Sequence, residues 1–252
     1  MLDPNPTAFD LRFRLLGTPV RVHPTFWLFS AFFGWSYYER EGHLGFLLLW
    51  IGCMFLSILV HEFGHILMAR FFGRPGHVVL YSFGGLAIGD YELRRSGQRI
   101  AVAAAGPAAG FLLYGAVIAV QVFGLPRLPL GWFAENPMLT RMVVVGIEML
   151  VFMNLMWSLL NLIPIFPLDG GQISKELFCL ARPADGLRLA LIFSILLAAA
   201  GAAYSLAIHF KVREGLPYPP ISPLFAAILL GLLAFENFTM LGQVGRSRGD
   251  GY

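Results

Sequence analysis

Charged residues are scarce in this chain. Lys, Arg, Asp and Glu make up 13% of its 252 residues, against 57% that are hydrophobic, whereas a typical soluble domain has about 25% charged residues. This balance excludes an ordinary water-soluble globular domain and is typical of a membrane protein. The net charge of +3 comes from basic residues scattered between apolar segments rather than clustered, so no nucleic-acid partner is expected.

Cysteine is scarce as well. Cys53 and Cys179 both lie in or beside apolar sequence, and two such residues cannot form a disulfide framework or a cysteine-based metal site. The chain also begins without an apolar stretch followed by a small-residue cleavage site. A removable signal peptide is therefore not expected.

Long runs without charge are abundant, and crossing the hydrocarbon layer takes about 20 residues. Six runs are candidate membrane spans, at about 22–38, 44–69, 100–126, 142–163, 189–210 and 222–242. They predict an all-α polytopic membrane protein with about six transmembrane helices. The spans and their short connections use nearly every residue, so residues 1–252 are expected to form a single domain.

Basic residues are distributed unequally between the two faces that six spans would create. One face would carry thirteen of the 18 Lys and Arg residues and the other five. The thirteen are Arg12, Arg14, Arg21, Arg70, Arg74, Arg94, Arg95, Arg99, Lys175, Arg182, Arg188, Arg246 and Arg248. Positive residues favour the cytosolic face, so both termini of this multi-pass protein are expected in the cytosol, at a bacterial cytoplasmic membrane.

The second span ends in a motif that carries chemistry. His61, Glu62 and His65 form H-E-x-x-H, which on a helix places two imidazoles one turn apart to bind one zinc ion, with the glutamate beside them as general base. Ionisable groups at membrane depth are rare and usually functional. The alternative is a purely structural histidine pair with a glutamate.

A catalytic zinc site usually has three protein ligands, so two histidines need a third. Asp169 is the best candidate, because Pro164 and Pro167 must break the fourth span just before it. Irregular backbone at that depth is tolerated only when it is buried or lines a wet cavity. The alternative is that Asp169 merely caps a helix that starts at Gly170.

Residues 78–88 are β-branched and aromatic and too short to span the membrane as a helix. They predict a re-entrant β-like loop whose edge could pair with an extended substrate. An ordinary interfacial loop is the alternative.

These motifs together resemble the site-2 protease family of intramembrane zinc metalloproteases. In that family an H-E-x-x-H helix is followed by a β-like loop with Gly-Gly, an Ala-Gly-Pro helix and N-x-x-P-x-x-P-L-D-G. The corresponding segments here are His61 to His65, Gly84-Gly85, Ala105 to Pro107 and Asn161 to Gly170. The compact arrangement, without a recognisable PDZ or CBS domain, is similar to the sporulation-type branch.

The resemblance implies roles for individual residues. His61, His65 and Asp169 would bind one zinc ion, Glu62 would be the base, and Asn161 would face the scissile carbonyl. Phe83, Gly84 and Gly85 of the loop are expected to contact substrate. Asn154 shares a helical face with Asn161 and joins this set, and His23 is a further candidate for a functional role. One departure is Gly110, where the family commonly has Asn.

The function that follows is zinc-dependent hydrolysis of a peptide bond in or near the transmembrane segment of a single-span membrane protein, in regulated intramembrane proteolysis. Further expected partners are the lipid bilayer and a regulatory membrane protein. Two rivals stay open: a catalytically inactive metal-binding membrane protein or transporter, and a membrane zinc protease of unrelated fold. Neither the substrate nor gating by Glu148 or Glu236 can be derived from the sequence.

Overall fold

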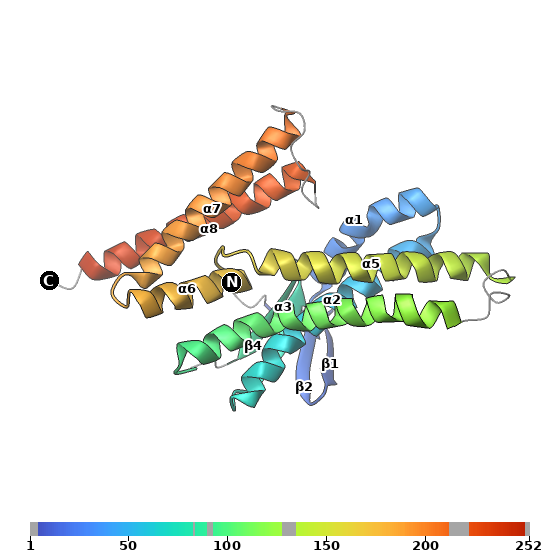
Figure 1. Ribbon diagram of the computed structural model, residues 1–252, viewed down its shortest axis with the longest axis horizontal. Coiled ribbons are helices and arrows are strands. Elements are labelled where there is room, and N and C mark those ends of the chain that lie inside the picture. The colour runs from blue at the N-terminus through green and yellow to red at the C-terminus, as the bar shows by residue number, and fades with distance from the viewer. Residues whose placement is uncertain (1–4, 83, 90–92, 128–134, 212–221, 250–252) are drawn as a thin grey trace. The chain divides into compact units, whose positions relative to one another are not determined.

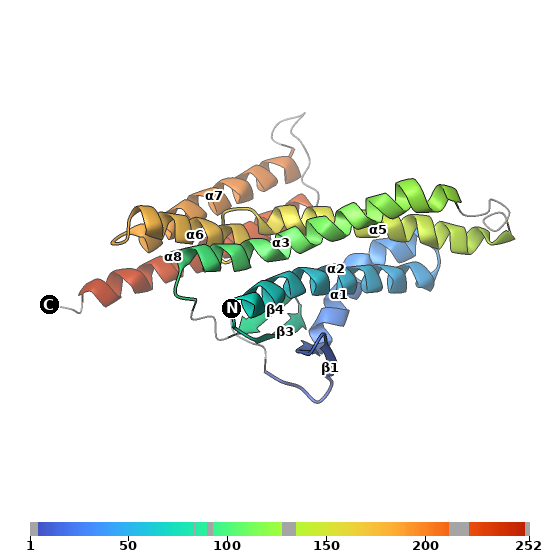
Figure 2. The ribbon, with the colours of Figure 1, turned by 60° about the horizontal axis from the view of Figure 1, so that its bottom comes forward.

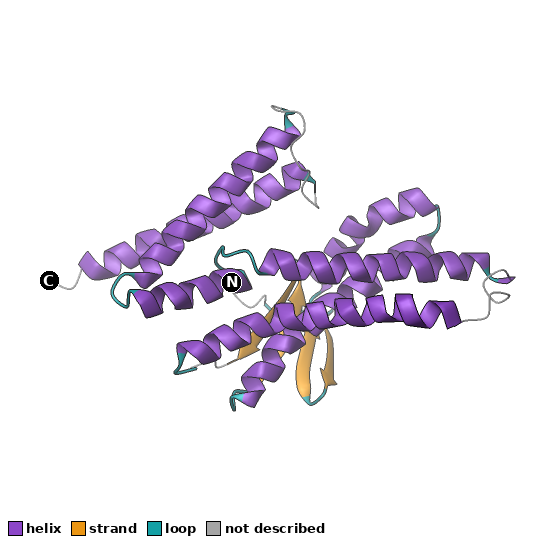
Figure 3. Ribbon diagram, in the orientation of Figure 1, coloured by secondary structure: helices purple, strands orange, loops and turns teal. Residues whose placement is uncertain are grey.

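The computed structural model describes residues 5–82, 84–89, 93–127, 135–211 and 222–249. Helices make up most of this part of the chain, and four short strands form one sheet (Figures 1 and 3). The prediction of a mainly helical protein is confirmed. The described chain forms two compact units, the first from residues 1–93 and 105–159 and the second from residues 94–104 and 160–252.

The first unit is built around one long apolar helix. This helix is α2 (Leu44–Phe71), and α1 (Pro24–Glu41) packs against it. The unit also contains most of α3 (Ser96–Ala119) and of α5 (Pro137–Asn161). A π-helical turn, Val120–Gly124, and a 3-10 turn, Leu125–Arg127, continue α3. The ends of α1 and α5 are joined by a two-point ion pair, because Arg141 donates to Glu41 at 2.8 and 3.1 Å.

The sheet lies in the first unit beside α2 (Figure 2). Its strands are β1 (Leu11–Leu15), β2 (Thr18–Val22), β3 (Gly76–Tyr81) and β4 (Gly84–Gly89), in that order. β1 and β2 pair antiparallel, β2 and β3 parallel, and β3 and β4 antiparallel. The alternation of β2, with Val20 and Val22 buried and Pro19 exposed, follows from the period of two in a strand.

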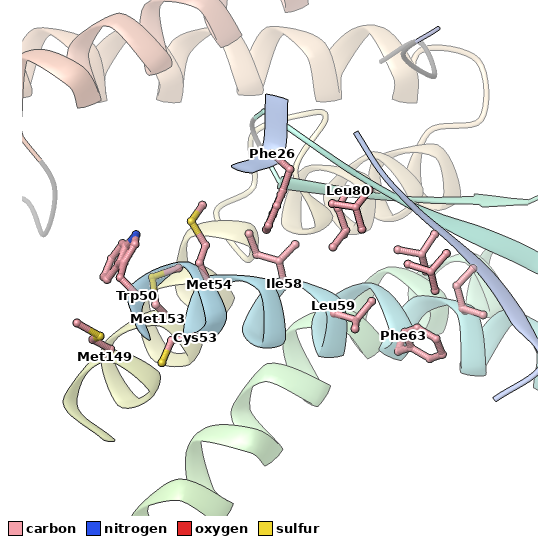
Figure 4. Close-up of a cluster of buried hydrophobic side chains, with 14 of the residues drawn as sticks. Phe26, Trp50, Cys53, Met54, Ile58, Leu59, Phe63, Leu80, Met149 and Met153 are labelled. Atoms are coloured by element: carbon pink, nitrogen blue, oxygen red, sulfur yellow. The ribbon is translucent and has the colours of Figure 1, made fainter. Parts of the chain in front are cut away.

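The core of the first unit joins the sheet to the helices. Its largest fully buried side chains include Phe26 from α1, Ile58 from α2, Leu80 from β3 and Met149 from α5. Figure 4 shows these residues in one cluster along α2. Because apolar packing is close to crystal density, this core fixes the rotation of α2 about its axis, and with it the direction of every side chain on that helix.

The second unit contains α6 (Asp169–Ala181), α7 (Gly186–His209) and α8 (Pro223–Gly249). The proline-containing segment before α6 is held by two polar side chains of these helices. Phe166 N–H donates to Ser194 Oγ at 3.1 Å, and Asn237 Nδ2 donates to Phe166 O at 2.5 Å. Arg99, at the start of α3, contacts Glu176 at 2.7 Å. Burial raises the pKa of Glu176, but hydrogen bonds from Arg99 and Ser96 and the charges of Arg99 and Lys175 together lower that pKa below its ordinary value.

Among the described residues, five helices are long and apolar enough to cross a membrane. They comprise residues 44–71, 96–124, 137–161, 186–209 and 223–244, and they match five of the six predicted spans. The first predicted span becomes α1, which has 18 residues and ends in Glu39, Arg40 and Glu41. Those three charges keep α1 out of this set, although its 18 residues, about 27 Å long at 1.5 Å per residue, can still cross most of the hydrocarbon layer.

Three features of the structure differ from the sequence-based prediction. Strands β1 and β2 were not expected, and the first span begins at Pro24 rather than at residue 22, because Val22 ends β2. The segment 78–88 forms most of a hairpin that runs from Gly76 to Gly89. Helix α6 was not expected as a separate helix, because its mixture of polar and apolar residues does not resemble a span.

Candidate metal centre

Helix α2 carries the three residues of the H-E-x-x-H motif on its buried side. His61, Glu62 and His65 are 2%, 5% and 7% exposed. The two imidazoles are one turn apart, and their Nε2 atoms are separated by 3.2 Å. Two nitrogen ligands on a tetrahedral zinc with Zn–N distances near 2.05 Å would be separated by about 3.3 Å. The imidazole pair therefore has the spacing that a shared metal ion requires.

The motif lies well inside the helix rather than at its end. Residues 61–65 precede the end of α2 at Phe71 by six to ten residues, which is about 9–15 Å at 1.5 Å per residue. α2 is also the longest of the candidate spans apart from the extended α3. Ionisable residues at membrane depth are costly and rare, and they usually have a function.

Helix α3 packs against the motif through small residues. A Cβ atom on Gly64 would collide with Ala105 O, so the two backbones are in direct contact there. A Cβ atom on Gly106 would collide with His65 Nε2 and lie 2.8 Å from His61 Nε2. Gly106 therefore lies directly beside both imidazole Nε2 atoms, and any side chain at that position would occupy their space.

Strand β4 packs against the H-E-x-x-H motif from another direction. A Cβ atom on Gly85 would collide with Glu62 Cγ and lie 2.5 Å from both Cδ and Oε1 of the same residue. The backbone of β4 thus passes directly over the Glu62 carboxyl group. Since β4 is an edge strand of the described sheet, an extended peptide paired with it would run close to this carboxylate.

A third buried side chain completes a group that could hold a metal ion. His61, His65 and Asp169 each offer one ligand atom, and these atoms lie within 4.8 Å of one another. α6 begins at Asp169 itself, while its N-cap residue is Leu168, which makes no side-chain cap hydrogen bond. Asp169 is therefore not in the cap position that the structural alternative assigned to it.

The two glycines that follow Asp169 allow the start of α6 to pack closely against the preceding loop. A Cβ atom on Gly170 would collide with Leu162 O, and one on Gly171 would collide with the backbone of Ile165 and Phe166. The proline-containing segment is therefore folded directly onto the first turn of α6. This packing holds the Asp169 backbone in place against its own loop.

Two nitrogens and one carboxylate oxygen fit zinc, because catalytic zinc sites combine histidine and carboxylate ligands and keep one position open. Glu62 lies in the same turn of α2 and is not needed as a ligand. The donor set therefore suits a metal ion that acts with an adjacent base.

The other predicted residues have different surroundings. Asn154 is 1% exposed and donates to Ser57 Oγ at 3.0 Å and to Leu150 O at 2.8 Å, so it links α5 to α2. Asn161 is the last residue of α5. Gly84 adopts a φ of +130° beside Trp157, a conformation that favours glycine. Phe83 lies outside the described residues.

His23 has a structural task. It is the N-cap of α1, and its Nδ1 accepts a hydrogen bond from Thr25 N–H at 3.3 Å and lies 2.8 Å from Thr25 Oγ1. Its backbone N–H donates to Leu80 O at 2.8 Å. These contacts place His23 at the junction of α1 and β3.

From the sequence, the Ala-Gly-Pro segment is recognisable only as part of a family pattern, and the contact of Gly106 with the imidazoles is not predicted. A glycine followed by proline inside an apolar span was the available signal, since both residues weaken a helix and need a reason to be there. Close helix approach beside a ligand is such a reason.

Gly106→Ala should displace both imidazoles. The added methyl group has no free space, and overpacking of this kind costs about 1–3 kcal/mol, so zinc binding should weaken about tenfold or more. Zinc content of the purified variant by mass spectrometry tests this. Gly115→Ala is the matched control, because it lies in the same helix and its Cβ would contact nothing within 4 Å; unchanged zinc in Gly106→Ala would contradict the assigned geometry.

The fold and the site define a class: a helical membrane protein with a buried H-E-x-x-H metal centre. Residues 49–136, which include this motif and the Ala-Gly-Pro segment, match the family model described as Peptidase family M50. Over this segment the chain is therefore similar to this family.

Curated relatives are similar to this chain over most of its length. The chain is 31% identical to stage IV sporulation protein FB of Bacillus subtilis over 71% of this chain and 56% of the relative. It is 28% identical to a zinc metalloprotease of Methanocaldococcus jannaschii over 66% of this chain and 44% of the relative. The chain thus spans about half the length of the curated relatives it matches.

The fold is similar to that of a solved structure, the site-2 protease from Methanocaldococcus jannaschii. The TM-score is 0.56, with 22% sequence identity, and the match covers 92% of this chain and 94% of the other. The predicted membrane architecture is therefore that of a known fold.

Proposed function

We propose that this protein is a zinc-dependent endopeptidase that hydrolyses a peptide bond in or near the transmembrane segment of a membrane-protein substrate. The observation that carries the proposal is the buried pair of imidazoles, with Nε2 atoms 3.2 Å apart and Glu62 beside them, inside a helix apolar enough to span a membrane. A metal site of this kind on a membrane helix suits hydrolysis of a buried peptide bond better than transport, which needs ligands at several depths.

One zinc ion would be held by His61, His65 and Asp169. When bound, zinc supplies Lewis acidity, which polarises a carbonyl group and acidifies water. Within this scheme Glu62 accepts a proton from the attacking water and delivers it to the leaving amine, the two tasks of a general base that becomes a general acid. Asn161 provides an amide N–H for the developing oxyanion.

The substrate would bind in extended form along β4. Strand addition at a sheet edge uses main-chain hydrogen bonds and so accepts different sequences. The contact between Gly85 and Glu62 supports this route, because a peptide on β4 would lie beside the base. Phe83, Gly84 and Gly85 would line this edge, and Asn154 would hold α5 in register with α2. A substrate helix must unwind first, so residues of low helix propensity near the cut should be favoured.

The direct test of the proposed function is cleavage of single-span membrane proteins from the host by the purified enzyme in lipid vesicles. Cleavage that requires zinc and stops with a chelator is the expected result. A protein that binds zinc but cleaves none of these substrates, while a second member of the family cleaves them under the same conditions, would instead fit a catalytically inactive metal-binding protein. Finding cleavage at a membrane-embedded bond would also support a role in regulated intramembrane proteolysis, with control by a separate membrane protein.

Both termini are proposed to lie in the cytosol of a bacterial cell, on the basis of the thirteen-to-five distribution of Lys and Arg. Cysteines introduced as Asp3→Cys and Asp250→Cys should then be shielded from a membrane-impermeant thiol reagent in intact cells. Glu135→Cys, in the loop expected outside, should be labelled. Labelling of position 3 or position 250 would contradict this orientation, and the unsubstituted chain corrects for Cys53 and Cys179.

A further inference from the structure

The β1–β2 hairpin and the residues just before it expose four large apolar side chains. Phe9 is 85% exposed, Leu16 is 67% exposed, and Leu11 and Leu15 are exposed as well. Isolated surface leucines need no explanation, but a group of this size on one short hairpin marks an interaction surface.

The turn of this hairpin contains a residue type that is unfavourable at its position. Leu15 and Thr18 pair across it, and the two residues between them, Leu16 and Gly17, have φ values of +49° and +76°. A turn with positive φ at both central positions favours Asn-Gly, Asp-Gly or Gly-Gly. Leucine is disfavoured there, and its side chain is exposed, so neither backbone preference nor packing within the chain accounts for it. An unfavourable conformation that is kept in spite of this cost points to a function.

The tip of the hairpin is held beside the end of α2. Arg70 donates from Nη1 to Leu16 O at 2.9 Å and from Nη2 to Thr18 Oγ1 at 3.0 Å. Arg70 is the next-to-last residue of this 28-residue helix, which is about 42 Å long at 1.5 Å per residue, whereas the hydrocarbon layer is about 30 Å thick. The end of such a helix reaches the membrane–water interface, and so does the turn attached to it.

The hairpin also presents positive charge. Arg12 and Arg14 lie two residues apart on one face of β1, and Arg21 is the cross-strand partner of Arg12. These three residues and His77 line a hollow of about 490 Å³. Asp10 pairs with Arg21 at 3.1 Å and with Arg12 at 3.5 Å, whereas Arg14 has no ion-pair partner within the described chain.

Asp10 does not neutralise this face. Hydrogen bonds from Thr7, followed by the hydrogen bond and charge of Arg21, lower the pKa of Asp10 far below its ordinary value. Asp10 is therefore a single fixed negative charge against three guanidinium groups, and the face keeps a net positive charge.

We propose that the β1–β2 hairpin is a lipid-binding element. Leu16 and its apolar neighbours enter the interfacial layer, and Arg12, Arg14 and Arg21 bind the phosphate groups of anionic phospholipids. Exposed apolar residues next to basic residues are the pattern of peripheral membrane attachment. This inference rests on α2 spanning a membrane and does not depend on proteolysis. The hairpin would hold the sheet, with β4 at its other edge, at a fixed height beside the bilayer.

The test places an environment-sensitive fluorophore on Leu16→Cys in the full chain. The protein is reconstituted in vesicles of phosphatidylcholine alone or mixed with phosphatidylglycerol. We expect a blue shift of the emission that grows with phosphatidylglycerol, and quenching by lipids that carry a spin label close to the headgroup. Arg12→Gln and Arg14→Gln should each raise the phosphatidylglycerol fraction needed for half of the shift, by up to about fivefold for each charge removed.

Arg182→Gln is the control for loss of one charge, because Arg182 lies at the end of α6 and outside the hairpin; it should leave the shift unchanged. The inference is overturned if the emission stays that of a water-exposed label in both lipids. It is equally overturned if the shift follows inorganic phosphate in detergent, or if it appears only when a protein substrate is added. Cleavage by the same labelled samples, measured in parallel, reports on the proposed protease activity separately.

Discussion

Glu62→Gln should abolish peptide hydrolysis while the protein keeps its zinc. Glu62 is buried beside the two imidazoles but is not one of the three side chains that offer ligand atoms within 4.8 Å of each other. Glutamine preserves the size of the side chain and cannot accept a proton. General acid–base catalysis contributes a factor of about 10²–10⁴ to the rate. The cleavage rate should therefore fall at least about 100-fold, and an end-point assay should detect no product.

Two measurements on the same preparation decide this prediction. Cleavage of a reconstituted single-span substrate should stop, and zinc content should remain that of the unsubstituted protein. Glu148→Gln is the matched control, because Glu148 is an exposed glutamate on α5 and its loss should change neither. Retained cleavage in Glu62→Gln would remove this residue from the reaction, and loss of zinc would make it a ligand.

The contact between β4 and Glu62 provides a second approach to the same residue. Gly85→Ala should push the carboxyl group aside, since the three atoms nearest to the added methyl group all belong to the Glu62 side chain. The expected result is slower cleavage with normal zinc content, the opposite of Gly106→Ala, in which zinc is lost. The two glycines thus separate damage to the base from damage to the metal site.

Several features of the metal centre could be predicted from sequence because they are local. The i, i+4 spacing of His61 and His65 and the place of Glu62 between them follow from helix geometry alone, and the apolar runs mark the spans through the thickness of the bilayer. For Asp169 the proline-broken helix at membrane depth left a helix cap and a metal ligand both open, and the resemblance to the site-2 protease family favoured the ligand. The helix motif and the spans are contained in short stretches of chain, whereas Asp169 needed a pattern spread over the whole chain.

Features that depend on distant segments could not be predicted in this way. Strand β2 pairs with β3 across more than fifty residues of sequence, and nothing in Thr18–Val22 alone distinguishes a paired strand from an extended linker. The contacts of Gly106 with the imidazoles and of Gly85 with Glu62 are also long-range. A glycine in the sequence shows only that a side chain is absent at that position. The fold is needed to show which neighbouring residue occupies the space of that side chain.

Asp169→Ala should lose both zinc and activity. Two histidines alone do not complete a catalytic zinc site, which requires three protein ligands. Asp169 is 8% exposed and lies with His61 and His65 in the one group of this kind within the described residues. Its carboxylate would also offset part of the charge of the metal in a poorly hydrated place.

The competing explanation is that Asp169 only stabilises the start of α6. In that case Asp169→Asn, which removes the charge but keeps a polar side chain in the first turn, should retain zinc and lose about 1 kcal/mol or less of stability. If Asp169 is a ligand, Asp169→Ala and Asp169→Asn should both lose zinc, because a neutral amide is a poor zinc ligand, while Asp169→Glu or Asp169→His should keep part of it.

Zinc content by mass spectrometry, measured together with thermal unfolding, separates these cases. His23→Asn is the control for a helix-start substitution, because asparagine is a good N-cap and His23 caps α1; it should keep its full zinc content. Full metal content in Asp169→Ala would leave the two histidines without their third ligand, and the proline-broken end of α5 would then need another explanation.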